Sequence, residues 1–414
     1  MNKEQKERQA PTCTEKSICI AFDSESEYQE IVGEPQKYRA YLEQALKQTP
    51  ELFPQGMSEG FSLHDLRESS KQPGLILRRV KLKQSQAVYT VRPSFMMPYL
   101  IAKTDEIEKA LYLRQWGVPF TALVYVFGHD AMFWYRAWLR LGRPNLVGST
   151  VKQEEKMPEH LLADEKITWL DREEVYVPTT VGGGCILGIS VAKQADGPAL
   201  KQAYAEFASE AAAVFPAYQP VSVCSDGWKA TREAWRCLFP MITLVLCYLH
   251  SILKISQRCT GELRHTVLDK AWDVYRATSK TSFAQRTRRL REWSKRYLTG
   301  APASMVEKLC ARKTDFLPAY DCPGAARTSN AVDRLLNHID RHLYAMYYFH
   351  GSQPAATLAV RAMAMQWNFH PYGLRLRHNQ PDRISPFADL NGFIYHNNWL
   401  HNCLIASSMG GSRS

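Results

Sequence analysis

The stretch VSVCSDGWKATREAWRCLFPMITLVLCYLH, residues 221–250, decides the fold. Two short apolar runs flank a segment with helical spacing, which predicts a strand, a crossover helix and a second, parallel strand. The first run ends at Asp226, and the second ends in a Cys-x-x-His pair, Cys247 and His250. Because α/β sheets place their ligand sites at the carboxyl ends of parallel strands, these three residues are candidates for a functional site.

The sequence before this stretch predicts the rest of the sheet. Apolar runs at 160–171, 173–184 and 185–192 are expected as strands, and 197–218 as a helix. The expected order is therefore β-β-β-α-β-α-β, a sheet that starts with a hairpin and continues with parallel strands and crossover helices. In a sheet of this order the first and fourth strands can lie side by side, so Asp164 and Asp226 would come close together.

Two neighbouring carboxylates repel each other, and a bound Mg²⁺ or Mn²⁺ removes that cost. Two metals about 3.5–4 Å apart can activate a nucleophilic oxygen and stabilise the leaving oxygen in phosphodiester chemistry. A third carboxylate usually completes such a site, and Asp333 is the candidate, near the start of a helix opened by RTSN. Asp340 competes for this role, but it lies two turns, roughly 10 Å, further along the helix.

The N-terminal region, residues 1–100, is expected to begin with a mobile tail to about residue 30 and to contain a helix. A β-hairpin at 75–91 should turn near KQSQ. Its exposed face would carry Arg78, Arg79, Lys81 and Lys83. Asp23 also follows an apolar run, but no neighbouring strands are expected there, so we do not assign it to a functional site.

The sequence pattern of residues 101–150 predicts three short helices joined by glycine-containing turns, which fits a helix-turn-helix DNA-binding domain. In that motif the last helix lies in the major groove, where Arg136, Arg140 and Arg143 would contact phosphates or bases. A plain three-helix bundle with an aromatic core explains the same pattern equally well.

The chain from 156 to 256 would form the first part of a catalytic core, followed by a helical insertion at 257–317. The insertion contains the basic stretch QRTRRLREWSKRY, in which Arg288, Arg289 and Arg291 would contact DNA or form a solvated helix face. Residues 318–350 would supply the final helix of the core. The C-terminal region, 351–414, is aromatic-rich with an irregular pattern and is expected to end in a frayed tail, SMGGSRS.

Composition limits the possible functions. A chain of 414 residues exceeds one average domain, and its net charge of +11 attracts polyanions such as nucleic acid. No apolar run is long enough for a membrane span, and the polar N-terminus is not a secretory signal. The ten cysteines include no Cys-x-x-Cys pair, so we expect reduced thiols and a cytoplasmic location.

The motifs DE after the first strand, SDGWKAT, CYLH and RTSNAVDR resemble, in this order, those of the DDE/D transposases. The similarity is to the Mutator-like group and its bacterial insertion-sequence relatives, and it covers roughly residues 161–351. It implies an α/β fold with a ribonuclease-H-like mixed sheet, a helical insertion before the third acid, and a preceding, mainly helical DNA-binding region. The third acid of the family is usually Glu, whereas this chain has Asp333.

The resemblance implies a DNA transposase of a mobile element, in which Asp164, Asp226 and Asp333 hold Mg²⁺ or Mn²⁺ for strand cleavage and strand transfer. The expected partner is double-stranded DNA, from transposon ends and target, bound by a homodimer or higher oligomer at the bacterial nucleoid. A DNA-binding relative that has lost catalysis and a structure-selective nuclease of the same fold remain alternatives.

Cys247 and His250 have two interpretations. They could hold zinc, but zinc takes about four ligands and no second pair is evident nearby in the sequence. In the alternative, Cys247 packs in the core while His250 positions the substrate strand or hydrogen-bonds a phosphate.

Overall fold

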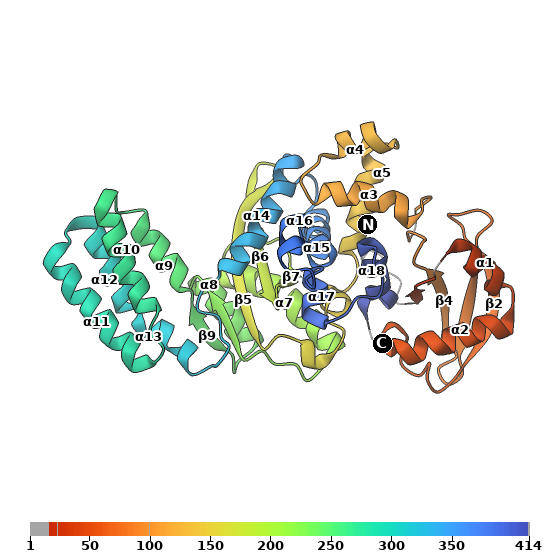
Figure 1. Cartoon of the computed structure of the whole chain (residues 1–414), viewed down its shortest axis with the longest axis horizontal. Coiled ribbons are helices and arrows are strands. Elements are labelled where there is room, and N and C mark those ends of the chain that lie inside the picture. Colours follow the sequence, from red (N-terminus) through yellow and green to blue (C-terminus); the bar gives the residue numbers. More distant parts are fainter. Residues whose placement is uncertain (1–15, 23, 99, 413–414) are drawn as a thin grey trace, which may run out of the picture.

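A computed structural model describes residues 16–22, 24–98 and 100–412, apart from the side chain of Asp333. Figure 1 shows three parts in a row: a helical lobe, a central sheet covered by helices, and a second sheet near the N-terminus. The central part carries Asp164 and Asp226.

Five strands form the central sheet. They are β5 (His160–Leu170), β6 (Glu173–Gly182), β7 (Cys185–Ile189), β8 (Ser222–Ser225) and β9 (Thr243–Leu246). Their spatial order is β7-β6-β5-β8-β9; the first three strands are antiparallel, and β8 is parallel to both β5 and β9. The predicted order of elements is confirmed, as is the prediction that the first and fourth strands are neighbours.

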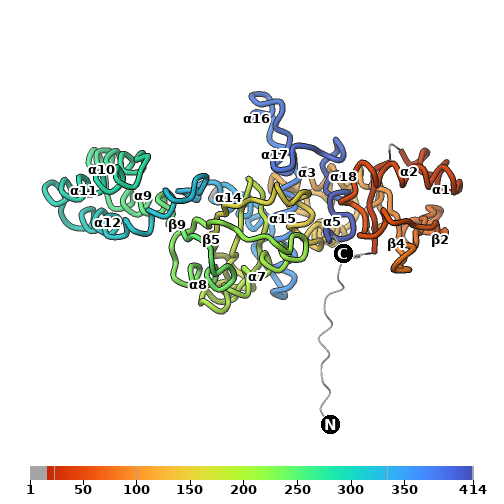
Figure 2. Tube along the Cα trace, turned by 90° about the horizontal axis from the view of Figure 1, so that it is seen from below, coloured from red at the N-terminus to blue at the C-terminus, as the bar shows by residue number. Residues whose placement is uncertain are grey.

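Helices cover both faces of this sheet. On one face lie α7 (Gly197–Val214) and α8 (Lys229–Leu238), and on the other lie α14 (Asn330–Ala345) and α15 (Gln353–Phe369). Figure 2 shows the two pairs on opposite sides of β5. In the described part of the chain, no helix combines the length and the apolar character that crossing a membrane requires.

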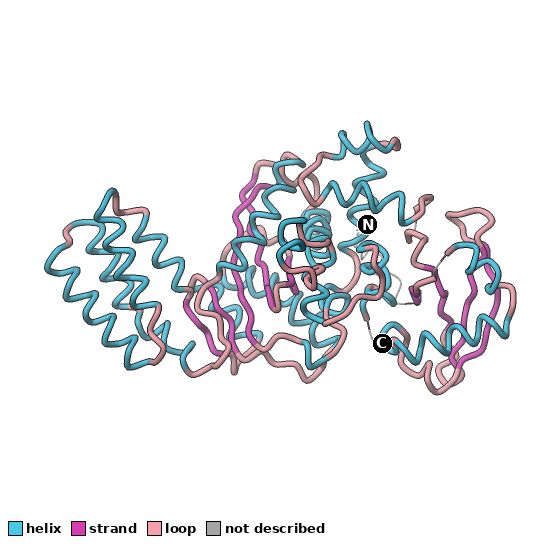
Figure 3. Tube along the Cα trace, in the orientation of Figure 1, coloured by secondary structure: helices cyan, strands magenta, loops and turns pink. Residues whose placement is uncertain are grey.

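The helical lobe is inserted between β9 and α14 and has a hydrophobic core of its own. Figure 3 shows that helices build this end of the molecule. They are α9 (Tyr248–Ser256), α10 (Gly261–Tyr275), α11 (Lys280–Tyr297), α12 (Gly300–Ala311), α13 (Lys313–Phe316) and the 3-10 turn η4 (Leu317–Tyr320). The last strand ends at Leu246 rather than at His250, so the lobe begins earlier than the helical stretch predicted from residue 257.

The N-terminal sheet has the order β1-β4-β3-β2 and packs against two helices. Its elements are β1 (Ser17–Ile20), α1 (Glu25–Val32), α2 (Pro35–Gln48), the 3-10 turn η1 (Pro50–Leu52), β2 (Phe61–Glu68), β3 (Ile76–Leu82) and β4 (Val88–Pro93). The predicted hairpin is confirmed as β3 and β4. The expectation of a tail to about residue 30 was wrong from Ser17 onward, because β1 pairs with β4. Asp23 lies outside the described residues.

Arg78 corrects the prediction for the exposed face of the hairpin. Its side chain is only 6% exposed, and its guanidinium donates hydrogen bonds to the carbonyl oxygen of Val32. Successive side chains of a strand point to opposite faces, so Arg78 and Arg79 could not both face solvent on the same side. Arg79 is on the outer face, where it forms an ion pair with Asp65 of β2.

The three helices predicted within 101–150 are present as α3 (Thr104–Arg114), α4 (Phe120–Phe127) and α5 (Ala131–Leu139). The chain then continues through the 3-10 turn η2 (Arg140–Gly142), α6 (Leu146–Thr150) and the 3-10 turn η3 (Glu154–Lys156). These helices pack on α15: the indole of Trp138 donates to Gln366 at 2.9 Å, and Arg361 donates to the carbonyls of Gly142 and Pro144. The three-helix unit is therefore joined to the central body by buried polar contacts.

The C-terminal region is more regular than its sequence pattern predicts. It forms α16 (Leu374–Asn379), α17 (Pro386–Asn391), α18 (Trp399–Ala406) and the 3-10 turn η5 (Ser408–Gly411). The expectation of a frayed end from residue 408 was wrong for η5, because Ser408 and Met409 are buried. Ser408 accepts a hydrogen bond from the Cys19 amide and donates one to Leu52, which joins η5 to the N-terminal sheet.

Candidate active site

The parallel register of the central sheet aligns the predicted residues at one level. Leu162 of β5 is paired with Cys224 of β8, and continuing this register by two residues sets Asp164 beside Asp226. On the other side of β8, Ser225 is paired with Leu246, so the next position sets Asp226 beside Cys247. Neighbouring strands are roughly 4.8 Å apart, so the two carboxylates belong to one site.

The two carboxylates differ in their surroundings. Asp164 lies within β5 and is 8% exposed; its Oδ1 accepts the amide hydrogen of Glu165 at 2.9 Å. Asp226 follows the end of β8, is partly exposed, and accepts the amide hydrogen of Trp228 at 2.8 Å. The turn after Asp226 needs glycine, because Gly227 has φ +81° and a Cβ there would lie 2.4 Å from the Leu246 side chain.

Cys247, Ser329 and His250 connect the sheet edge to the start of α14. Ser329 donates its amide hydrogen to Cys247 Sγ at 3.1 Å, and its Oγ lies 3.2 Å from that sulfur. The same Oγ lies 3.4 Å from His250 Nδ1, while His250 Nε2 lies 3.8 Å from Asp164 Oδ2. A chain of polar contacts thus runs from the α14 N-cap residue to Asp164.

This network alters the protonation of its members. Hydrogen bonds from Cys224, and then from His250 and Ser329, lower the pKa of the Cys247 thiol to about 3. The hydrogen bond to Cys247 raises the pKa of His250 to about 9, with help from the nearby carboxylates. The hydrogen bond to Cys247 raises the pKa of Cys224 well above its usual range. The raised pKa of His250 favours its charged form, which lies 3.8 Å from Asp164.

Glu165 follows Asp164 on β5, but its side chain lies on the opposite face of the sheet, toward α7 and α8, and the sequence reasoning gave it no role. Its carboxylate accepts hydrogen bonds from the hydroxyls of Tyr204 at 2.6 Å and Thr231 at 2.5 Å. Burial raises the pKa of Glu165 to about 7, and the hydroxyls and nearby Asp164 modify that shift. The adjacent acid pair in the sequence was the available signal, but the two hydroxyl partners come from α7 and α8.

The third predicted acid, Asp333, lies in the first turn of α14, one turn after Ser329; its side chain is outside the described part of the structure. The start of α14 is fixed beside the sheet edge, because the Tyr248 amide also donates to the Arg327 carbonyl at 2.9 Å. Asp340 is engaged elsewhere, in an ion pair with Lys166 of β5 whose Nζ–Oδ1 distance is 2.8 Å. Among the described side chains, no three histidine, cysteine or acidic groups are gathered as a metal site.

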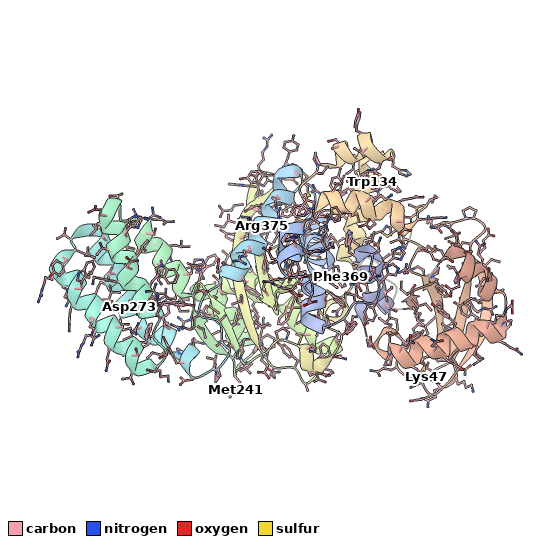
Figure 4. The ribbon with its side chains drawn as sticks, in the orientation of Figure 1. Lys47, Trp134, Met241, Asp273, Phe369 and Arg375 are labelled. Atoms are coloured by element: carbon pink, nitrogen blue, oxygen red, sulfur yellow. The ribbon has the colours of Figure 1, made fainter. Side chains whose placement is uncertain are left out.

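The predicted DNA-binding arginines of the three-helix unit lie far from those of the insertion. Arg136 is exposed on α5, and with Arg140 it lines a surface pocket of about 540 Å³ that also includes Lys71. Arg143 is exposed just after η2. In Figure 4, Trp134 marks α5 and Asp273 marks the insertion, with the central sheet between them.

The three arginines of α11 are not equivalent. Arg291 forms a bidentate ion pair with Glu307 of α12. Arg288 Nε lies 3.5 Å from Oε1 of Glu292, one turn along the helix. Arg289 is exposed, and no carboxylate of the described residues pairs with it. Arg289 is thus the most available of the three for a phosphate.

No family model matches this chain, and no curated protein is similar enough to it to be identified as a relative. The geometry of the site therefore carries the functional argument.

Proposed function

We propose that this chain is a DNA transposase, an enzyme that cleaves transposon ends and joins them to target DNA with a divalent metal. The feature that supports the proposal is the parallel pairing of β5 with β8, whose register, continued two residues beyond Leu162 and Cys224, brings Asp164 and Asp226 to the same level of the sheet. The helical insertion between β9 and α14, which precedes Asp333, agrees with a ribonuclease-H-like core of this class.

The donor set fits Mg²⁺ or Mn²⁺. Asp164 and Asp226 offer hard carboxylate oxygens from neighbouring strands, and Asp333 would complete the set from the first turn of α14. Such a metal pair would activate the attacking oxygen and stabilise the leaving oxygen of the phosphodiester.

The chain's own groups would orient the site and the DNA. The Glu165 amide fixes one Asp164 oxygen, and the cationic His250 balances the charge of the carboxylates and offers a proton donor to a strand phosphate. Arg136, Arg140 and Arg143 would recognise the terminal repeats, and Arg289 would contact DNA beside the insertion. Cutting of paired ends would require a dimer or higher oligomer on DNA, and the enzyme would act at the bacterial nucleoid.

The first prediction tests catalysis directly. Duplexes that carry the DNA flanking the gene are incubated with the full-length protein and Mg²⁺, and strand products are resolved on a denaturing gel. Asp164→Asn and Asp226→Asn should abolish cleavage but retain DNA binding, because each removes a metal ligand and leaves the basic surfaces intact.

The matched control is Asp171→Asn, in the β5–β6 turn of the same hairpin. Asp171 has φ +49°, a conformation that Asn also tolerates, so this variant should cleave as the wild type does. Cleavage that persists in either site variant would contradict the metal-site assignment. Wild-type protein that binds the flanking DNA without cutting it would favour the DNA-binding alternative.

A further inference from the structure

A pocket of about 240 Å³ lies where the helical insertion meets the sheet edge. Asp226 and His250 line one side of it, and Lys254 of α9 lines it together with Lys308 of α12 and Arg312, the residue that follows α12. The carboxylate site and the insertion therefore share one cavity.

The cationic side chains of this pocket are available to bind an anion. Lys254 and Lys308 are exposed, and neither forms an ion pair with a carboxylate among the described residues. Arg312 is oriented by Asp315, with 3.2 Å between Nε and Oδ2. Its guanidinium lies directly over the backbone after Asp226, since a Cβ on Gly227 would come within 2.5 Å of Arg312 Nη2.

The remaining walls suit the rest of a nucleotide. Met305 and Leu309 give the pocket an apolar surface beside its cations, which can contact a sugar or the face of a base. The volume lies just below the range of about 300–1,000 Å³ of small-molecule sites, so it fits one unit of a strand better than a complete cofactor.

We propose that this pocket binds the backbone phosphates of the DNA strand next to the bond that is cut, with Lys254, Lys308 and Arg312 as positioning residues. This inference rests on the proposed function, because it assumes that DNA lies at Asp226. The insertion would then hold the strand in register with the carboxylates, so that binding energy from the lobe orients the reacting phosphodiester.

The test measures strand binding rather than cleavage, with the full-length protein and Ca²⁺ in place of Mg²⁺. A fluorescein-labelled single-stranded oligonucleotide is titrated by anisotropy at several salt concentrations. The Lys254→Gln/Lys308→Gln variant should bind more weakly, and the slope of log K against log salt should fall by about 1.4, since each phosphate contact on a single strand contributes about 0.7.

The control removes two charges away from the pocket. Lys201 on α7 and Lys47 on α2 are both exposed and outside the pocket lining, so Lys201→Gln/Lys47→Gln should keep the wild-type slope. A methylphosphonate moved along the oligonucleotide then removes one phosphate charge at a time. One or two adjacent positions should weaken wild-type binding and have no further effect on the pocket variant.

The outcomes separate the two proposals. Equal slopes and equal methylphosphonate profiles for wild type and pocket variant would overturn the pocket assignment and leave the transposase proposal standing. Inorganic phosphate that raises the melting temperature of the wild type but not of the pocket variant, with a flat methylphosphonate profile, would identify a free-anion site and also overturn it. Wild-type protein that binds neither the single strand nor a duplex would contradict the proposed function itself.

Discussion

Asp340 and Asp333 share helix α14, and their positions assign them different roles. Asp340 pairs with Lys166 where both side chains are partly exposed, whereas Asp333 lies near the anchored start of the helix. We predict that Asp340→Asn retains cleavage and loses at most about 1 kcal/mol of unfolding free energy, which is typical of a solvent-accessible ion pair. Asp333→Asn should stop cleavage with little change in stability, as measured by the cleavage gel and by thermal melting.

A loss of cleavage in Asp340→Asn together with full activity in Asp333→Asn would show that the helix presents the other acid to the metals. Asp340 pairs with Lys166 because α14 lies along β5, and pairing across elements is not visible in sequence spacing.

At the residue scale, the sequence predicted the ends of strands better than the partners of side chains. Asp226 could be predicted because an apolar run stops there, and Asp164 because it interrupts a similar run. The stretch RTSN predicted the start of a helix, with Thr328 or Ser329 as a possible cap, yet the Ser329 hydroxyl contacts Cys247, 82 residues away, and makes no capping hydrogen bond. Such contacts depend on the folded path of the chain, which local patterns do not specify.

At the scale of the element, α14 is held by two histidines that are buried in neutral form. His338 and His342 are 0% exposed, and the His342 ring stacks on Trp138 with centroids 5.8 Å apart. Burial lowers the pKa of His338 to about 3 and that of His342 well below its usual range. Other positive or titratable groups facing them are Arg114 of α3, Arg341 of α14 and His370, which follows α15.

We predict that His342→Phe stabilises the protein and reduces its sensitivity to acid. Neither His342 ring nitrogen has a hydrogen-bond partner among the described residues, so replacement should gain about 1–2 kcal/mol at pH 7. The unfolded chain binds a proton to His342 below about pH 6.5 and the folded chain does not, so this group reduces stability as pH falls. Chemical denaturation from pH 7 to pH 4 should therefore show a shallower decline for the variant.

His378→Phe is the control, because His378 is exposed on α16 and should leave the pH dependence unchanged. If His342→Phe and the wild type lose stability equally from pH 7 to pH 4, His342 must take up its proton over the same pH range in the folded state as in the unfolded chain. That result would contradict the neutral, buried assignment.

Secondary structure elements were predictable where their patterns were long or sharply bounded. The order of the elements along the central domain and the β3–β4 hairpin followed from apolar runs and turn residues, and the two helices after Gly117 and Gly128 followed from those glycines. The strand β1 was missed because it has only four residues, and its pairing of Ser17 with Thr90 spans most of the N-terminal region. The short helices of the C-terminal region lack a strong helical period; α17 and α18 are stabilised by burial against the rest of the chain, whereas α16 buries none of its residues.

At the scale of the whole molecule, the end of the chain joins parts that are distant in sequence. The turn η5 contacts β1 of the N-terminal sheet and α6 of the central body. The Asn145 amide donates to the Gly410 carbonyl at 2.8 Å, and the backbones approach so closely that a Cβ on Gly148 would lie 1.8 Å from the Gly411 oxygen. Gly148 and η5 therefore form a contact that only a glycine permits.

We predict that truncation after Ser407 loosens the N-terminal sheet from the central body. The loss of Met409, which is 1% exposed, removes about 1.5–3 kcal/mol of burial energy, and the amides of Cys19 and Asn145 lose their acceptors at a further cost. The melting temperature should fall, and hydrogen exchange should accelerate at both amides.

Truncation after Gly411 is the matched control and should behave as the wild type, because it keeps η5. If the shorter chain keeps its melting temperature and the protection of the Cys19 amide, the N-terminal sheet must be held to the body by its other contacts, such as the bond between Ser94 Oγ and His401 Nδ1 at 3.0 Å.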